Sequence, residues 1–156
     1  MTILTETTPP AVLQSRDERL SDLASDLRAA GGYRSSHTPV EALSRPAILG
    51  RIGALLASCV PPGTDRIVCI QEDTLIGAAV SLHTGVPLVV MAGNETSIGE
   101  LHRTENVAGV GYSEASHDAV ARGVRDAGGT LTVMATVFNK GTEGLAGASS
   151  SLFTVP

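Results

Sequence analysis

Hydrophobic residues recur along the chain with two spacings, one typical of helices and one typical of buried strands. Leucine, isoleucine and alanine at three- and four-residue intervals predict helices over residues 15–30, 44–60, 75–84 and 116–127. Short runs rich in β-branched residues predict strands over residues 66–70, 87–91, 107–110, 131–138 and 152–155. Strands that alternate with helices are typical of a mostly parallel sheet, so the pattern predicts an α/β fold.

These elements fit a single three-layer α/β domain over residues 15–156, with a mainly parallel sheet of four to five strands. The two N-terminal helices are expected to cap or flank the sheet. Residues 1–14 are rich in Thr and Pro and show no apolar period, which predicts a flexible N-terminal segment. A chain of 156 residues can bury a core without disulfides or metals.

Charge and composition exclude several classes of function. Eleven basic against sixteen acidic residues give a net charge of −5, so we expect no binding to a nucleic acid polymer. No apolar run reaches the roughly 18 residues of a membrane helix, and the first twenty residues lack a secretory pattern. A cytoplasmic protein that does not bind a membrane follows. Cys59 and Cys69 show no metal-ligand spacing, which predicts buried thiols and no metal site.

Three loops follow predicted parallel strands, at residues 71–75, 93–103 and 109–116. Ligands bind at this end of open parallel sheets, because helix N-termini and unpaired backbone N–H groups meet there. The chain has no Trp and few aromatic residues. Recognition of a base or ring would therefore use backbone groups or one of four side chains, Tyr33, Tyr112, Phe138 and Phe153.

Four blocks of the chain resemble the type I phosphoribosyltransferases, and within them the orotate phosphoribosyltransferases. The blocks are LSRPAILGRIGALLA (43–57), DRIVCIQEDTLIGAAVSLHTGVPLVVM (65–91), AVARGVRDAGGTLTVMATVFN (119–139) and SLFTVP (151–156). They occur in the family's order. The resemblance implies the type I phosphoribosyltransferase fold, here with a reduced hood, and a homodimer.

The family's motif for phosphoribosyl pyrophosphate is degenerate in this chain. The family carries two adjacent acidic residues at the end of its third strand, and alignment of the following helix places Val107 and Ala108 there. Neither side chain accepts a hydrogen bond or helps to hold Mg²⁺. The turn for the 5′-phosphate is better preserved, and the resemblance assigns phosphate or ligand binding to Gly109, Gly111, Tyr112, Ser113, Ala115 and Ser116.

The other two functional loops of the family are also altered. Glu72 matches the acidic position of the pyrophosphate loop, but Asp73 and Thr74 stand where the family has small residues. The counterpart of the mobile catalytic loop, residues 93–103, contains no lysine, and its cations are His102 and Arg103. The groups that would stabilise a departing pyrophosphate are therefore missing.

We accordingly predict a divergent member of the family that binds a nucleotide, ribose phosphate or related anion, without normal transfer from phosphoribosyl pyrophosphate. Asp73 and Thr74 join the phosphate turn as expected ligand contacts, although a solvated or helix-capping Asp73 fits the sequence as well. Tyr112 is expected either to cover a ligand ring or to lie partly buried. A Gly111→Asp substitution is expected to remove anion binding with little change in the fold.

The alternative is an active transferase or hydrolase on an atypical phosphorylated sugar or nucleotide. Glu72, Glu114 and His102 would then serve as acid, base or charge stabiliser, and Mg²⁺ would be a cofactor only in this case. The two hypotheses differ in geometry, because an enzyme needs Glu72 and Glu114 to converge on one substrate.

Overall fold

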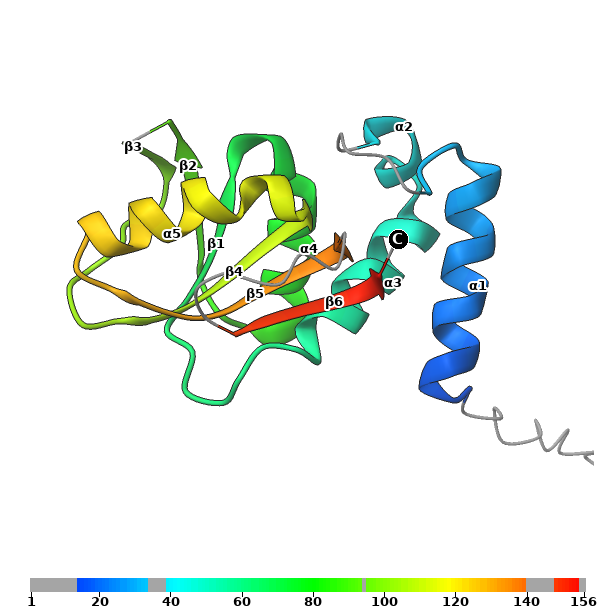
Figure 1. The fold of residues 1–156 in the computed structure, drawn as a ribbon, viewed down its shortest axis with the longest axis horizontal. Coiled ribbons are helices and arrows are strands. Elements are labelled where there is room, and N and C mark those ends of the chain that lie inside the picture. The colour runs from blue at the N-terminus through cyan, green and yellow to red at the C-terminus, as the bar shows by residue number, and fades with distance from the viewer. Residues whose placement is uncertain (1–13, 34–38, 94, 140–147, 155–156) are drawn as a thin grey trace, which may run out of the picture.

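The structure, a computed structural model, describes residues 14–33, 39–93, 95–139 and 148–154. Within these residues the sheet has six strands in the order β3-β2-β1-β4-β5-β6 (Figure 1). The strands are β1 (Arg66–Ile70), β2 (Leu88–Ala92), β3 (Glu95–Ile98), β4 (Asn106–Ser113), β5 (Thr130–Asn139) and β6 (Ser149–Thr154). All neighbouring strands are parallel except β2 and β3. The predicted α/β class with a mainly parallel sheet is confirmed.

The helices begin and end at signals that are visible in the sequence. They are α1 (Arg16–Ala29), α2 (Val40–Leu43), α3 (Pro46–Ala57), α4 (Thr74–Thr84) and α5 (His117–Asp126). A capping box opens α1, because the Ser15 hydroxyl accepts the Glu18 N–H and the Glu18 carboxylate accepts the Ser15 N–H. Gly85 ends α4 at a φ of +72°, a conformation that glycine adopts without strain.

Helices cover both faces of the sheet and form the three layers (Figure 1). Helix α5 packs on one face, where Val120 and Val124 meet buried valines and methionines of the strands. Helices α3 and α4 cover the other face and contact each other closely, since a Cβ at Gly53 would lie 2.8 Å from the Cβ of Ala79. Helix α1 packs against α3, away from the strands, as the expected flank.

The antiparallel strand β3 was not predicted, because the sequence favours a polar loop between residues 93 and 105. All four residues of β3 are exposed, so the strand has no covered face and therefore no apolar alternation. Gly99 follows the strand at a φ of +72°, and a Cβ there would lie 2.5 Å from the Leu88 carbonyl oxygen. Glycine permits this close backbone approach next to the antiparallel pairing of β3 with β2. The prediction of four to five strands is therefore too low by at least one.

Residues 1–13 of the predicted flexible segment lie outside the described part of the chain. None of the described helices has the length and apolar character needed to cross a membrane.

Candidate functional site

Two neighbouring strands end in the same way at the carboxyl edge of the sheet. Strand β1 runs into a 3₁₀ turn, η1 (Gln71–Asp73), and then α4, while β4 runs into η2 (Glu114–Ser116) and then α5. Because β1 and β4 are parallel neighbours, both turns and both helix N-termini lie at one edge. Backbone N–H groups give such helix ends a partial positive charge. The predicted loops at 71–75 and 109–116 are thus brought together.

Buried polar side chains mark this same edge. Among the described residues, four polar or charged side chains are buried, each 3–4% exposed: Asp73, Ser116, His117 and Thr136. They come from η1, η2, the first turn of α5 and strand β5, where Thr136 pairs with Gly111 of β4. We call them the carboxyl-edge cluster. Buried polar groups are costly unless satisfied, so their concentration at one place indicates a candidate site.

Asp73 connects the two turns across the edge. Its Oδ1 accepts the backbone N–H of Tyr112 at 3.3 Å, although the two residues lie 39 positions apart. Its Oδ2 lies 3.0 Å from the position that a Cβ would take on Gly111. The alternative of a solvated Asp73 is wrong, because the side chain is buried and reaches the end of β4. Asp73 is the N-cap residue of α4, but its side chain makes no capping hydrogen bond. No residue pattern in the sequence predicts the contact between residues 73 and 112.

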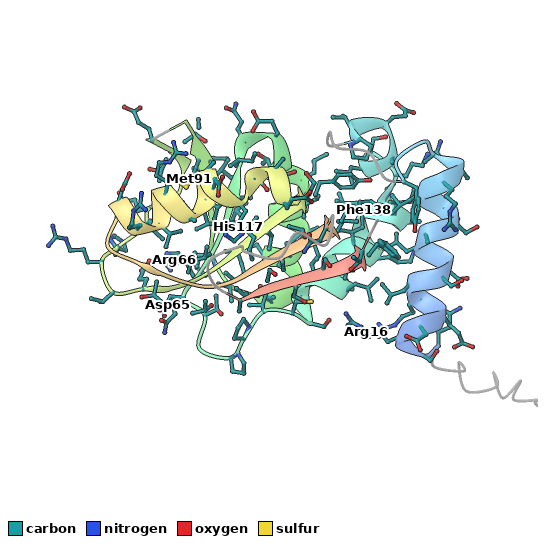
Figure 2. The ribbon with its side chains drawn as sticks, viewed as in Figure 1. Arg16, Asp65, Arg66, Met91, His117 and Phe138 are labelled. Atoms are coloured by element: carbon teal, nitrogen blue, oxygen red, sulfur yellow. The ribbon has the colours of Figure 1, made fainter. Side chains whose placement is uncertain are left out.

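His117 opens α5 and faces the sheet (Figure 2). Its spacing of three and seven residues from Val120 and Val124 places all three on the buried side of the helix. Within the described part of the chain its Nδ1 atom has no hydrogen-bond partner. A buried, unpartnered ring nitrogen at a helix N-terminus suits a ligand that brings its own hydrogen-bonding group. The sequence analysis did not assign His117 to the site, although its spacing from Val120 and Val124 on one face of the predicted helix was visible.

Gly111 lies at the centre of the cluster, and its lack of a side chain is a packing requirement. A Cβ there would lie 2.3 Å from Ser116 Oγ and 3.0 Å from Asp73 Oδ2. The expectation that Gly111→Asp leaves the fold unchanged is therefore wrong. Gly109 lies in mid-strand below α5, where a Cβ would approach Val120 to 2.9 Å, so it permits helix packing and lies outside the turn.

Gly111→Ala is expected to lower the free energy of unfolding by about 1–3 kcal/mol, because the added methyl overpacks the cluster. Gly50→Ala is the matched control, since a Cβ on this α3 residue would meet nothing within 4 Å. Because alanine has the higher helix propensity, we expect Gly50→Ala to raise the free energy of unfolding by at most about 1 kcal/mol. Urea unfolding measures both variants, and equal stability of Gly111→Ala and the wild type would contradict the packing argument.

Tyr112 does not cover a ligand ring. Its side chain is 1% exposed on the α3 and α4 side of the sheet, and its hydroxyl donates to the Gly32 carbonyl at the end of α1. The sequence contains two Tyr, two Phe and no Trp, and all four rings form one cluster. Phe138 is at its centre, with ring centroids of Tyr33, Tyr112 and Phe153 at 5.2–5.4 Å. The four aromatic side chains therefore pack against one another in the core beside the candidate site.

The residues assigned to the family's acidic pair do not lie at the end of a strand. Val107 and Ala108 are near the beginning of β4, where Val107 pairs with Arg66 at the amino edge (Figure 2). The assignment is wrong because the turn before α5 is only three residues long. The strand instead ends with Tyr112 and Ser113, so the end of β4 still carries no acidic pair.

The three proposed acid–base residues are only partly brought together. Glu72 and Glu114 lie in the adjacent turns η1 and η2, and no hydrogen bond or ion pair joins them among the described residues. His102 lies beside the other end of α5, where the Thr104 N–H donates to Gly128. The length of α5, about 15 Å for ten residues, separates it from η2. The combination of His102 with both glutamates is therefore not formed.

His102 instead lines an open cavity of about 380 Å³ on the flank of α5. Met91 and Gly123 also line it, and the His102 ring lies 3.8 Å from the Glu100 carboxylate.

The remaining turn residues mostly satisfy one another. The Thr74 hydroxyl donates to the Gln71 carbonyl at 2.6 Å, and the Ser116 hydroxyl donates to the Ser113 carbonyl at 3.0 Å. The Ala115 N–H donates to the Ser113 hydroxyl at 3.4 Å. These bonds define the shape of the two turns.

The described residues do not fit a divalent cation. No three His, Cys, Asp or Glu side chains gather among them in a way that could hold a metal ion. The buried carboxylate at this edge, that of Asp73, accepts a backbone N–H.

Solved structures of low sequence identity share the fold of this chain. Orotate phosphoribosyltransferase of Mycobacterium tuberculosis, in complex with inorganic phosphate, superposes with a TM-score of 0.72 at 16% identity, over 86% of this chain and 95% of that one. The chain has the type I phosphoribosyltransferase fold. A phosphoribosyltransferase of Corynebacterium diphtheriae has a TM-score of 0.70 at 14% identity, over 86% and 95% of the chains.

Adenine phosphoribosyltransferase of Saccharomyces cerevisiae is similar to the chain with a TM-score of 0.62 at 19% identity, over 85% of this chain and 99% of that one. No protein-family model and no curated protein matches the sequence. The type I phosphoribosyltransferase fold is therefore recognised by its architecture, and the fold alone does not assign a chemistry to the carboxyl edge.

Proposed function

We propose that the protein binds a small phosphorylated ligand, such as a nucleotide or ribose phosphate, at the carboxyl edge of its sheet without transferring ribose phosphate from phosphoribosyl pyrophosphate. The observation that carries this proposal is the carboxyl-edge cluster. Its four buried polar side chains lie where the N-termini of α4 and α5 meet, and one of them, His117, has an unpartnered ring nitrogen. Helix N-termini of this kind favour anions.

The similar structures support the choice of ligand class. Orotate phosphoribosyltransferase of M. tuberculosis has been solved with inorganic phosphate and with 5-phospho-α-D-ribosyl 1-diphosphate. In this chain the end of β4 and the turn η2 carry the small residues Ser113, Ala115 and Ser116, which suit a close approach of an anion to the backbone.

The residues needed for transfer argue against the usual reaction. Transfer passes through a cationic sugar while a multiply charged anion departs, and both charges need stabilising groups. Strand β4 ends in Tyr112 and Ser113 without a carboxylate pair, and residues 95–103 contribute no lysine. A binding or regulatory role therefore fits the site better than catalysis.

The second candidate, a transferase or hydrolase acting on an atypical phosphorylated sugar or nucleotide, is favoured by one observation. Glu72 and Glu114 occupy adjacent turns at the same edge, close to the buried Asp73 carboxylate. A substrate that draws the two glutamates together would give an acid–base pair.

We also propose that the protein is a cytoplasmic homodimer. The exposed Leu75 and Leu82 are seven residues apart on one face of α4, and a second copy would cover them. Cys59 and Cys69 are free thiols, which suits a reducing compartment.

Thermal unfolding with added ligands tests the proposed function. We expect inorganic phosphate, ribose 5-phosphate and uridine monophosphate to stabilise the protein by about 2.7 kcal/mol at 100 times their Kd, with no requirement for Mg²⁺. Incubation with phosphoribosyl pyrophosphate and orotate is expected to release no pyrophosphate. Mg²⁺-dependent stabilisation by phosphoribosyl pyrophosphate together with pyrophosphate release would establish the enzymatic alternative instead.

A further inference from the structure

The buried carboxylate of Asp73 occupies a position that an anionic ligand would compete for. It lies between η1 and the end of β4, at the edge where both helix N-termini begin. It already accepts the Tyr112 N–H at 3.3 Å, and its other oxygen lies over Gly111. The protein therefore supplies its own anion to the end of β4.

The negative charge of Asp73 also extends beyond the turn. Burial and, as the smaller cause, the Asp73 charge raise the pKa of the Cys69 thiol on β1, the strand that leads into η1. A phosphate at the same edge would experience this charge as repulsion in surroundings of low dielectric. An amide of the same shape would accept the Tyr112 N–H through its oxygen and offer N–H donors to the phosphate.

We propose that Asp73 is an internal competitor for the phosphate site and sets the affinity of that site for phosphorylated ligands. This inference rests on the proposed function, since it concerns the same edge of the sheet. Asp73 is a specificity-determining residue in this view, because its charge penalises multiply charged anions most strongly. Displacement of its carboxylate from the Tyr112 N–H would accompany tight binding.

Isothermal titration with inorganic phosphate and with ribose 5-phosphate tests the proposal. We expect Asp73→Asn to bind both ligands at least tenfold more tightly than the wild type. Asp65→Asn is the matched control: Asp65 Oδ2 accepts the Asn106 N–H at 2.8 Å, the same kind of bond at the opposite end of β4. Figure 2 shows Asp65 at the end of the sheet remote from Phe138. This control is expected to leave both affinities unchanged.

The result for Asp73→Asn decides the inference, and the result for the wild type decides the proposed function. Tighter binding by the variant supports the inference even if the wild type binds neither ligand. An affinity equal to or below that of the wild type, or no binding by the folded variant, overturns it. Asp73→Ser, which keeps an oxygen acceptor without the charge, replaces Asp73→Asn if urea unfolding shows that the amide variant does not fold.

Discussion

Tyr112→Ala is expected to lower the free energy of unfolding by about 3–5 kcal/mol, the range for removal of a fully buried aromatic side chain. The ring is 1% exposed, its centroid lies 5.4 Å from that of Phe138, and its hydroxyl donates to the Gly32 carbonyl. Alanine would leave a cavity in the core and a carbonyl without its partner. Equilibrium unfolding in urea measures the loss.

Tyr112→Phe separates the two contributions. It keeps the ring and removes only the hydroxyl, so we expect a loss of about 1–3 kcal/mol, the penalty for an unsatisfied buried group. Tyr33→Phe is the control at a partly buried ring of the same cluster, and its effect is expected to be smaller. A Tyr112→Ala protein as stable as Tyr112→Phe would show that the ring contributes little to the core.

Tyr112 links the core to the site, because its side chain and its backbone N–H have different partners. Its ring points into the core between the sheet and α3, while its N–H donates to Asp73 at the carboxyl edge. The end of β4 is thereby attached to Gly32, which follows α1, through the Tyr112 hydroxyl, and to η1 through the Tyr112 N–H. This double attachment gives the edge a defined shape before any ligand binds.

The elements of the fold were predictable because their signals are local. Runs of apolar, mostly β-branched residues in strands that are covered on both faces, such as residues 67–70, contain no polar side chain. Capping residues such as Ser15 and Gly85 define helix ends by their own backbone chemistry. Strand β3 has neither signal, because it is an exposed edge strand that is defined by its pairing with β2.

Of the candidate site, only the positions of its loops were predictable from the sequence. Parallel topology places the ends of β1 and β4 at one edge, so residues 71–75 and 109–116 could be named in advance. The inward turn of Asp73 depends on the geometry of a three-residue 3₁₀ turn, which residue spacing does not encode. The misplacement of Val107 and Ala108 has the same cause, since alignment on α5 leaves the length of the preceding turn undetermined.

Alkaline pH is expected to destabilise the protein steeply above pH 9. Burial, aided by the Asp73 charge, raises the pKa of Cys69 from 9.0 to about 12, and burial also raises the pKa of Tyr112 above its ordinary 10.0. At a pH between the ordinary pKa of each group and its raised pKa in the native state, the unfolded chain loses a proton that the native state retains. The native state therefore binds more protons, and its stability falls as pH rises.

For Cys69 the stability is complete below pH 9 and falls by about 1.4 kcal/mol per pH unit up to pH 12, so about 3 kcal/mol is lost by pH 11. Urea unfolding between pH 7 and 11 measures the slope. Cys69→Ala is expected to flatten it between pH 9 and 10, whereas Cys59→Ala, at a partly buried thiol, serves as the control that keeps it. A stability that is independent of pH in the wild type would mean that the Cys69 thiol ionises in the native state, which its position beside a buried carboxylate opposes.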